Sequence, residues 1–455
     1  MTLIKSISGF RGTIGGEVYE NLTPLDLVKF ASAYAEWLKS TNSDKKLTVV
    51  LGRDARISGE MVSHIVEGTL MGCGINVINI GLASTPTTEV AVTGLNADGG
   101  IILTASHNPK QWNALKLLNG KGEFLNASEG AKILEIAEND SYSYSDVDSL
   151  GSSTKSSYDT QHIEQVLALE LVDVEAVKAA KLKVVVDAVN SVGGTIIPEL
   201  LEKLGVEVVK LNCTPDGNFA HNPEPLKENL TDISKLVVKE KADMGIVVDP
   251  DVDRLAFICE NGEMFGEEYT LVACADYVLS KTSGDTVSNL SSSRALSDIS
   301  AKHNCKYAAS AVGEVNVVTM MKETNAIIGG EGNGGIIYPE SHYGRDALVG
   351  VGLFLTHFVN YGKKISELRA DLPEYYISKN KVELTPDVDV DAILVKIKEK
   401  FASERVNDID GVKIDFEEGW VHLRKSNTEP IIRIYSESSS EQKANDLAKI
   451  VIDAM

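Results

Sequence analysis

Short, continuously apolar segments recur along this chain, and amphipathic helical patterns separate them. The clearest segments are residues 47–52 (LTVVLG), 183–187 (KVVVD) and 243–249 (DMGIVVD). Each is of strand length, and its centre is apolar on both faces. A helical pattern follows the first segment at residues 59–71, and another follows the second and ends at Leu204. Strands that are apolar on both faces need helices above and below them, so the pattern predicts parallel sheet in an α/β fold.

The chain is long enough for several such units. Its 455 residues predict roughly three or four domains. A segment rich in Ser, Asp, Tyr and Gly at residues 139–160 lacks apolar periodicity and is the best candidate for a linker. The C-terminal part differs, because two strands at 420–423 and 431–435 flank a polar loop and a helix follows at 441–454. This order predicts a small α+β domain.

The formal net charge of −22 limits the classes of partner. Binding to nucleic acid depends on many Lys and Arg contacts to phosphate, so we expect no nucleic-acid partner. No apolar run approaches the ~20 residues that cross a bilayer, and we expect neither a signal peptide nor a membrane partner. The five cysteines lack metal-site or disulfide spacing, which favours reduced thiols and a cytoplasmic location. A protein this acidic needs a local positive site if its ligand is an anion.

A candidate nucleophile lies in residues 104–109 (TASHNP), directly after an expected strand at 100–103. A turn of small residues at a strand end exposes a hydroxyl, so Ser106 is a candidate nucleophile or phosphate carrier. The neighbouring His107 does not by itself make a hydrolase triad, and the chain has no G-x-S-x-G elbow at this point. The alternative interpretation is a polar turn with a serine cap.

A candidate metal site lies in residues 249–254 (DPDVDR), at the end of another expected strand. Asp249, Asp251 and Asp253 alternate, so their carboxylates can converge on one hard cation. Ligation by a few oxygen atoms suits Mg²⁺, which keeps positions open for phosphate or water. The alternative interpretation is a solvated acidic turn.

Two further loops are candidates for ligand binding. Residues 329–335 (GGEGNGG) place Glu331 and Asn333 among glycines, which let the backbone approach a ligand closely. Residues 424–430 (RKSNTEP), with Arg433 close behind, bring guanidiniums, hydroxyls and an amide to one turn. Such a turn suits a phosphate. The alternatives are a flexible glycine loop and a solvated hairpin loop.

Together and in this order, the four motifs resemble those of the α-D-phosphohexomutase superfamily. Residues 8–13 (SGFRGT), 52–59 (GRDARISG) and 84–87 (STPT) resemble further motifs of that family, and the resemblance covers nearly the whole chain. It implies three similar mixed-sheet α/β domains and a C-terminal α+β domain around a central cleft. We place these domains at residues 1–145, 159–256, 257–370 and 375–455.

The resemblance also implies residue roles and a mechanism. Ser106 would be phosphorylated in the active enzyme, and Mg²⁺ would bind Asp249, Asp251, Asp253 and the phosphoserine. Phospho-Ser106 would pass its phosphoryl group to a sugar phosphate through a sugar 1,6-bisphosphate, which is both intermediate and activator. The remaining predicted site residues are Arg11, His107, Lys116 and Arg254 for catalysis, Glu331 and Asn333 for the sugar, and Arg424, Ser426, Asn427, Thr428 and Arg433 for the second phosphate.

The sugar is the open part of this prediction. The sequence Glu-Gly-Asn-Gly from Glu331 resembles the archaeal-type members, which act on glucosamine, mannose or glucose phosphates. We expect conversion of glucosamine 6-phosphate to glucosamine 1-phosphate, with phosphoglucomutase/phosphomannomutase activity as the alternative. A sugar phosphatase, which would release free phosphate, is a weaker alternative. A non-catalytic sugar-phosphate sensor is another, and it would need no phosphate carrier. The expected partner is a hexose phosphate, and the protein is expected to be a monomer or homodimer.

Overall fold

The computed structural model describes residues 2–6, 9–42, 45–383, 389–425 and 431–455. The chain divides into two compact units. Unit 1 comprises Met1–Thr270 and Gly334–Glu367, and unit 2 comprises Leu271–Asn333 and Leu368–Met455.

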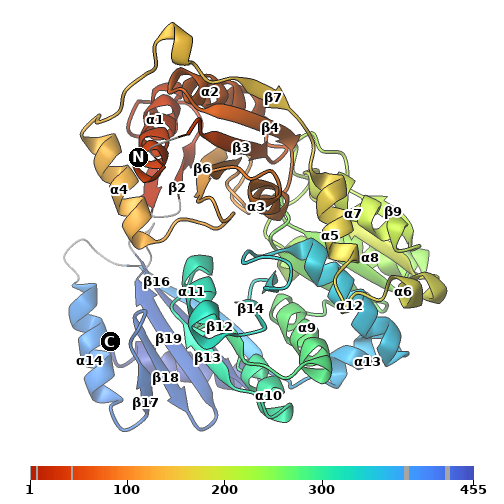
Figure 1. The fold of residues 1–455 in the computed structure, drawn as a ribbon. Helices are drawn as coiled ribbons and strands as arrows, with labels where there is room; N and C mark the ends of the chain where they lie inside the picture. Colours follow the sequence, from red (N-terminus) through yellow and green to blue (C-terminus); the bar gives the residue numbers. More distant parts are fainter. Residues whose placement is uncertain (1, 7–8, 43–44, 384–388, 426–430) are drawn as a thin grey trace. The chain divides into compact units, whose positions relative to one another are not determined.

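The first sheet of unit 1 is mixed and has seven strands (Figure 1). From edge to edge they are β1 (Ile4–Ser6), β2 (Gly9–Thr13), β6 (Trp112–Leu118), β5 (Gly99–Leu103), β3 (Thr48–Arg53), β4 (Asn76–Leu82) and β7 (Ser153–Lys155). Strands β5, β3, β4 and β7 run parallel, whereas β6 is antiparallel to both β5 and β2. The expected strand at 47–52 is therefore confirmed as β3.

Hydrophobic clusters lie on both faces of this sheet, as its apolar strands require. Within β3, Val49 and Leu51 join one cluster and Val50 joins a second one. The helices that contribute to these clusters are α1 (Pro24–Thr41), α2 (Gly59–Gly72) and α4 (Ala127–Glu138) in the first and α3 (Thr85–Gly94) in the second. The helix expected at 59–71 is α2.

The structure differs from the sequence prediction at residues 139–160, because part of this expected linker belongs to the sheet. Val147–Ser149 form a short 3-10 helix, and Ser153–Lys155 form β7, which pairs with β4. The backbone N and the Oγ of Ser152 each lie 3.0 Å from Asn76 Oδ1. Since β7 is a short, largely exposed edge strand that polar contacts hold, no apolar periodicity marks it in the sequence.

The second sheet of unit 1 has four strands, in the order β11 (Leu255–Cys259), β10 (Met244–Val248), β8 (Lys183–Asp187) and β9 (Glu207–Leu211). β10, β8 and β9 run parallel, and β11 returns antiparallel to β10. β11 spans the position at which we placed a domain boundary, between residues 256 and 257. The remaining elements of this part are α5 (Asp159–Leu167), α6 (Val174–Ala180), α7 (Gly193–Lys203), a 3-10 helix (Lys227–Asn229), α8 (Thr231–Glu240), β15 (Gly335–Ile337) and α12 (Ala347–Tyr361).

Unit 2 contains a parallel and an antiparallel sheet. In the first, β12 (Thr286–Asn289) lies between β13 (Tyr307–Ser310) and β14 (Ile328–Glu331), and all three strands are parallel. The second sheet has the order β16 (Tyr376–Glu383), β20 (Ile431–Ser438), β19 (Gly419–Lys425), β18 (Val412–Phe416) and β17 (Arg405–Asn407). The helices of unit 2 are α10 (Ala295–Lys302), α11 (Glu314–Thr324), α14 (Val390–Lys400) and α15 (Glu441–Ile452), while α9 (Glu267–Lys281) and α13 (Ile365–Ala370) span the crossings between the units.

The antiparallel sheet and α15 confirm the α+β arrangement expected for the C-terminal part. Residues of β18, β19 and β20 share one hydrophobic cluster with α14 and α15. In the part of the chain that the structure describes, no helix combines the length and apolarity needed to cross a membrane.

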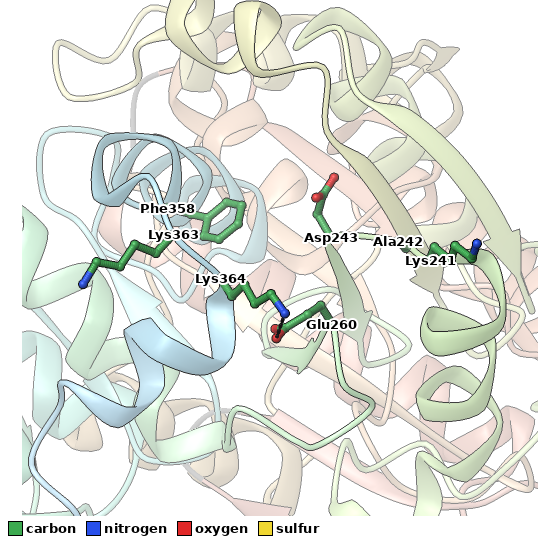
Figure 2. Close-up of a pocket in the computed structure, with 7 residues that line it drawn as sticks. All are labelled: Lys241, Ala242, Asp243, Glu260, Phe358, Lys363 and Lys364. Atoms are coloured by element: carbon green, nitrogen blue, oxygen red, sulfur yellow. Dashed lines mark ion pairs between the residues drawn. The ribbon is translucent and has the colours of Figure 1, made fainter.

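An open depression lies on the surface of unit 1 (Figure 2). Inside it, Lys364 Nζ forms an ion pair with Glu260 Oε1 at 4.0 Å. Its lining residues are Lys241, Ala242, Asp243, Glu260, Phe358, Lys363 and Lys364. None of the residues that line this depression is one that the sequence predicts for catalysis or binding.

Candidate active site

Ser106 lies in the turn after β5, and its backbone has an unusual conformation. Its φ angle is 49°, in the left-handed region that residues other than glycine rarely adopt. Ser106 N donates to Thr104 Oγ1 at 2.9 Å. Such a conformation persists only where the surrounding structure fixes it, and it is found preferentially at functional sites.

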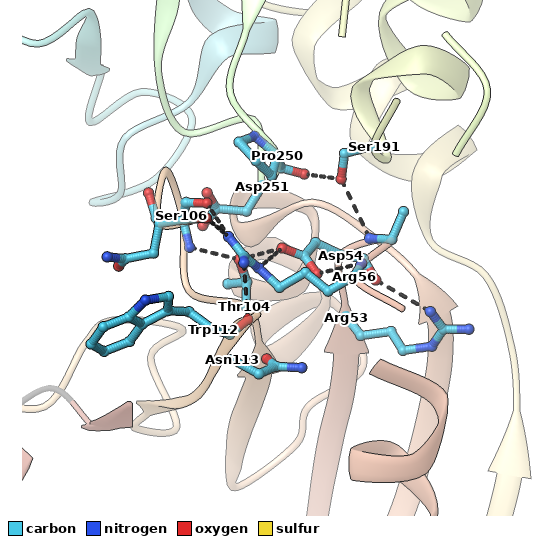
Figure 3. Close-up of polar contacts among 12 residues, drawn as sticks. Arg53, Asp54, Arg56, Thr104, Ser106, Trp112, Asn113, Ser191, Pro250 and Asp251 are labelled. Carbon is cyan, nitrogen blue, oxygen red and sulfur yellow. Dashed lines mark hydrogen bonds and ion pairs between the residues drawn. The ribbon is translucent and has the colours of Figure 1, made fainter. Parts of the chain in front are cut away.

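One buried guanidinium holds this turn by its carbonyl oxygens (Figure 3). Arg56, which is 1% exposed, donates through Nη2 to Ser106 O at 2.5 Å and to Asn108 O at 2.8 Å. Its Nη1 donates to Pro109 O at 2.8 Å and to Trp112 O at 2.9 Å. The rigid fork of an arginine can serve several acceptors at once, so Arg56 fixes the whole loop that carries Ser106.

Asp54 and Ser191 extend this network on either side of Arg56. Asp54 Oδ2 accepts from Arg56 Nε at 2.9 Å and from Thr104 Oγ1 at 2.7 Å. Ser191 Oγ accepts from Ala55 N at 3.3 Å and donates to Pro250 O at 2.6 Å (Figure 3). The segment around Arg56 is thereby bonded both to the serine turn and to the aspartate loop.

Asp249, Asp251 and Asp253 follow β10 and lie together in the interior. All three are 0% exposed, and one ligand oxygen from each lies within 4.8 Å of the other two. Ser106 Oγ donates to Asp249 Oδ2 at 3.0 Å. The structure thus brings the predicted nucleophile to the predicted metal ligands, 143 residues further along the chain.

The electrostatics of this cluster fit a divalent cation. Burial and the charges of Asp251 and Asp253 raise the pKa of Asp249 well above its usual value. Among the described residues, Asp251 Oδ1 and Asp253 Oδ1 have no hydrogen-bond partner although both are buried. Converging buried carboxylates with unused oxygens are the donor set that Mg²⁺ takes.

The other oxygens of Asp251 and Asp253 are held by three side chains. Asp251 Oδ2 accepts from Lys116 Nζ at 2.7 Å and from Thr85 Oγ1 at 2.6 Å. Asp253 Oδ2 accepts from Arg345 Nη2 at 2.6 Å. Burial lowers the pKa of Lys116, but the negative charges of Asp251 and Asp253 outweigh it and raise that pKa overall. Lys116 is therefore a cation at neutral pH.

A second group of cations lies near Ser106. Arg254 N donates to Asp249 Oδ1 at 3.2 Å, and Arg254 Nη1 pairs with Glu224 Oε1 at 3.3 Å. Burial and then the charge of Arg254 lower the pKa of Arg11, in β2, and of His107. His107 Nδ1 lies 3.5 Å from Ser106 Oγ, at the limit of a hydrogen bond. His107 is thus a neutral ring in a positively charged environment.

The predicted sugar-binding residues lie in unit 2, at the end of β14. Glu331 Oε1 accepts from Asn289 Nδ2 at 2.7 Å and from Gly313 N at 3.1 Å. Glu331 Oε2 lies 3.4 Å from Asn333 Nδ2. The carboxylate and the amide are therefore neighbours.

The predicted phosphate loop joins β19 to β20, also in unit 2. Arg424 and Arg433 are directly opposite each other in the ladder of these two strands. Arg424 Nε lies 3.5 Å from Asp410 Oδ2. Ser426, Asn427 and Thr428 lie outside the described residues.

Several residues that support the site have no role that the sequence motifs predict. The segment GRDARISG contains Asp54 and Arg56 and resembles a family motif, but nothing in it indicates that the guanidinium serves Ser106. The contacts of Thr85, Glu224 and Arg345 connect residues 166, 30 and 92 positions apart. Thr85 lies in the family motif at residues 84–87, but the motif does not indicate its partner.

Comparisons with known proteins identify the whole chain with one family. Four phosphoglucomutase/phosphomannomutase domain models match it in order. They are alpha/beta/alpha domain I at residues 3–143, domain II at 160–262, domain III at 266–376 and the C-terminal domain at 381–454.

Whole-length relatives carry related names. A phosphoglucomutase/phosphomannomutase of Thermococcus kodakarensis is 38% identical over 97% of both chains. A phosphoglucosamine/phosphogalactosamine mutase of Sulfurisphaera tokodaii is 34% identical over 96% of both chains. A crystal structure of a phosphoglucomutase/phosphomannomutase family protein from Burkholderia thailandensis has the same fold, with a TM-score of 0.85, 24% identity and coverage of 99% of this chain and 97% of that one. The chain therefore belongs to the phosphoglucomutase/phosphomannomutase family of the α-D-phosphohexomutase superfamily, and it is a phosphohexomutase, an intramolecular phosphotransferase.

Proposed function

We propose that this phosphohexomutase interconverts hexose 6-phosphate and hexose 1-phosphate through a phosphoserine at Ser106. The observation that carries the proposal is the hydrogen bond from Ser106 Oγ to Asp249 at the edge of a buried carboxylate cluster. A phosphoryl group on this serine would lie beside a cation site. Phosphoryl transfer depends chiefly on such positioning and on neutralised charge.

Asp249, Asp251 and Asp253 are the proposed ligands of Mg²⁺, together with the phosphate on Ser106. When bound, the ion would supply positive charge to the transferring phosphoryl group. Lys116, Thr85 and Arg345 each hold one oxygen of an aspartate. We infer that they orient the carboxylates, as outer partners of metal ligands do.

In the first chemical step, the bond between Ser106 Oγ and phosphorus breaks while a bond from the free sugar hydroxyl to phosphorus forms. The product is a sugar 1,6-bisphosphate, and the hydroxyl proton must finally reside on Ser106 Oγ. Lys116 is cationic because its pKa is raised, so we propose that it begins the step as a general acid and protonates Ser106 Oγ. The proton of the sugar hydroxyl then passes to Lys116 and restores its charge. The bisphosphate reorients, and the reverse step returns its other phosphoryl group to Ser106.

Arg11 and Arg254 are proposed to neutralise the oxygens of the phosphoryl group, with the neutral His107 as a hydrogen-bonding neighbour. Glu331 and Asn333 are proposed to bind sugar hydroxyls. The proposed site for the second phosphate consists of Arg424, Ser426, Asn427, Thr428 and Arg433. The position of Arg424 directly opposite Arg433 in the ladder supports this assignment, since it brings two guanidiniums, the groups that bind phosphate best, to the same loop.

For the sugar, we propose glucosamine phosphate as the preferred substrate. The Sulfurisphaera relative, named for glucosamine and galactosamine phosphates, supports this choice. The Thermococcus relative, named for glucose and mannose phosphates, supports phosphoglucomutase/phosphomannomutase as the second candidate. Since glucosamine, glucose and mannose differ at position 2 of the ring, a strong preference among these three needs a group that bonds the substituent at that position.

Coupled assays test the proposal, with glucosamine, N-acetylglucosamine, glucose and mannose phosphates compared by kcat/KM. We expect isomerised sugar phosphate, stimulation by traces of the bisphosphate, and the highest kcat/KM for glucosamine phosphate. A higher value for glucose or mannose phosphate moves the assignment to the second candidate. Release of free phosphate without isomerisation contradicts a mutase altogether.

The proposed partner is thus a small hexose phosphate, and the proposed location is the cytoplasm. The net charge of −22 supports the absence of a nucleic-acid partner. The five cysteines are free, which supports a reducing compartment. Light scattering would decide between monomer and homodimer.

A further inference from the structure

A buried histidine outside the proposed catalytic groups connects two parts of unit 1. His162, in α5, is 0% exposed. Its Nδ1 lies 2.9 Å from Thr87 Oγ1, in α3, and its Nε2 lies 2.8 Å from Asp346 Oδ2, at the start of α12. α5 packs against both α3 and α12. His162 therefore joins segments that are more than 250 residues apart in the sequence.

Each end of this bridge adjoins a residue that holds a proposed metal ligand. On the α3 side, Thr85 donates to Asp251 twice, from its backbone N to the carbonyl at 2.8 Å and from Oγ1 to Oδ2 at 2.6 Å. Thr87 is two residues further along the same helical turn.

On the α12 side, Arg345 Nη2 donates to Asp253 Oδ2 at 2.6 Å, and Ala347 N donates to Val252 O at 3.2 Å. Asp346 lies between these two residues. Its Oδ1 caps α12 by accepting from Leu348 N at 2.8 Å, so its carboxylate is fixed on both oxygens.

The hydrogen bonds of His162 belong to a continuous buried series. His162 Nε2 donates to Asp346 Oδ2, and His162 Nδ1 shares a hydrogen bond with Thr87 Oγ1. Thr87 Oγ1 in turn shares a hydrogen bond of 2.6 Å with Ser84 Oγ, and Ser84 Oγ caps α3 by accepting from Thr87 N at 3.0 Å. Because every member is satisfied and buried, the series holds both segments in one arrangement.

A metal ion is the competing explanation, because the ring nitrogens of His162 and His342 converge with Asp346. The distances favour hydrogen bonds. Asp346 Oδ2 lies 2.8 Å from His162 Nε2 and 3.1 Å from His342 Nε2. Ligands around a tetrahedral zinc ion lie about 3.3 Å apart for typical bond lengths.

We propose that His162 is a positioning residue for the magnesium site. It holds the Thr85 turn and the Arg345 segment in the arrangement that presents Asp251 and Asp253 to the ion. The inference rests on the proposed role of these aspartates. Its distinctive consequence is that removing the bridge weakens metal binding without removing any ligand.

The test measures Mn²⁺ binding to the full-length protein by electron paramagnetic resonance, since Mn²⁺ accepts the same oxygen ligands. The variants are His162→Phe, which keeps a ring and loses both hydrogen bonds, and His162→Gln, whose amide offers one donor and one acceptor. Val166→Ala is the matched control, because Val166 is equally buried on α5 and forms no part of the bridge. Hydrogen exchange at the amides of Thr85 and Ala347 is the second readout.

We expect His162→Phe to raise the Mn²⁺ dissociation constant roughly three- to tenfold, somewhat less than the ~10–100-fold effect of an immediate partner of a ligand. Exchange at Thr85 and Ala347 should accelerate, and His162→Gln should restore much of both properties. Val166→Ala should lower the melting temperature and leave the dissociation constant unchanged.

Four results would overturn the inference. Equal Mn²⁺ affinity in wild type and His162→Phe refutes the positioning role while leaving the proposed metal site intact. An equal loss of affinity in Val166→Ala shows that general destabilisation explains the effect. If the wild-type protein binds no Mn²⁺ at Asp249, Asp251 and Asp253, the proposed metal site itself is refuted. If a stoichiometric metal ion is lost when His162 is replaced, His162 belongs to a second metal centre and not to a hydrogen-bonded bridge.

Discussion

At the scale of single residues, Ser106 combines a strained backbone with a hydroxyl that donates to Asp249. Ser106→Ala removes only one oxygen atom, and Arg56 still binds the backbone of the turn. We expect mutase turnover to fall by several orders of magnitude, because the proposed phosphate carrier is lost, while the melting temperature stays the same. Intact-mass spectrometry should show a phosphate-sized addition on part of the wild-type protein and none on the variant. Near-normal turnover in a verified variant would end the phosphoserine proposal.

Arg56 is the residue on which the serine turn depends. Arg56→Ala leaves the Asp54 carboxylate buried without its cation, and this should lower the free energy of unfolding by about 3–5 kcal/mol. Denaturant unfolding measures this change. Arg53→Ala is the control from the same motif. Its Nη1 donates to Asp54 O at 3.2 Å, and a single charge-assisted hydrogen bond of this kind contributes about 1.5–3 kcal/mol, so the loss should be smaller. Similar losses in both variants would show that Arg56 has no special part.

The sequence predicted the reacting group and its surroundings better than the residues that hold them. Ser106, Lys116 and the three aspartates were predicted from local motifs, and the structure brings them together. Arg56, Thr85 and Arg345 act through contacts across distant segments, so their local sequence carries no sign of the partner. Glu331 and Asn333 are neighbours as expected, whereas the assignment of their sugar stays a prediction.

At the scale of helices and strands, buried strands were predictable and polar edges were not. The strand expected at residues 183–187 is β8 with the same bounds. Its valines are apolar on both faces, which gives a local signal. β7 is short, exposed and held by polar contacts, and a segment of this kind resembles a linker in sequence.

Strands β19 and β20 place Arg424 and Arg433 opposite each other. Arg424→Ala and Arg433→Ala should mainly weaken substrate binding, since charge-assisted bonds to phosphate contribute roughly 1.5–3 kcal/mol each. Steady-state kinetics should show a KM about tenfold higher or more, with a smaller change in kcat. Lys443→Ala, on α15, removes the same charge at an exposed site and should leave KM unchanged. An unchanged KM in both arginine variants would refute the phosphate site.

His422, on β19, makes the stability of this sheet depend on pH. Its Nε2 donates to Asp410 O at 2.7 Å, and its Nδ1 lies 2.9 Å from Ser291 Oγ. Burial, together with the charge of Lys413, lowers its pKa to about 4. The unfolded chain, with a pKa of about 6.5, then binds more protons, so the free energy of unfolding should fall between pH 6.5 and about 4, by up to roughly 3 kcal/mol.

The variant His422→Gln isolates this contribution, because a glutamine amide can serve the same partners without titrating. Melting temperatures measured from pH 7 to pH 4 should fall less steeply for the variant than for the wild type. Parallel curves would contradict a depressed pKa.

At the scale of the whole molecule, the net charge of −22 opposes the binding of any anion. The proposed enzyme overcomes this field locally, with a divalent cation at the aspartates and with cationic side chains. The family and the four-domain α/β fold predicted from the sequence are confirmed. The domain bounds and the central cleft stay predictions, because sequence patterns locate strands better than the points between domains.

Removal of the divalent cation should leave the negative charge at the active site uncompensated. With EDTA, the three carboxylates of Asp249, Asp251 and Asp253 would repel the phosphoryl group, and we expect activity to be silenced. Added Mg²⁺ should restore it, whereas Asp251→Ala should stay inactive at any Mg²⁺ concentration. Full activity in the chelator, measured by the coupled assay, would exclude a required metal.

The hydrogen bonds from Arg56 to the serine turn affect which substitutions the turn can accept during evolution. All four of its acceptors in the turn are main-chain carbonyls, those of Ser106, Asn108, Pro109 and Trp112. A carbonyl oxygen is the same in every amino acid, so this grip does not depend on which side chains the turn carries. A substitution beside Ser106 is therefore compatible with these hydrogen bonds if it leaves the backbone conformation of the turn unchanged. The side chains next to Ser106 can therefore change during evolution, and substrate preference can change with them, while the Ser106 hydroxyl keeps its position.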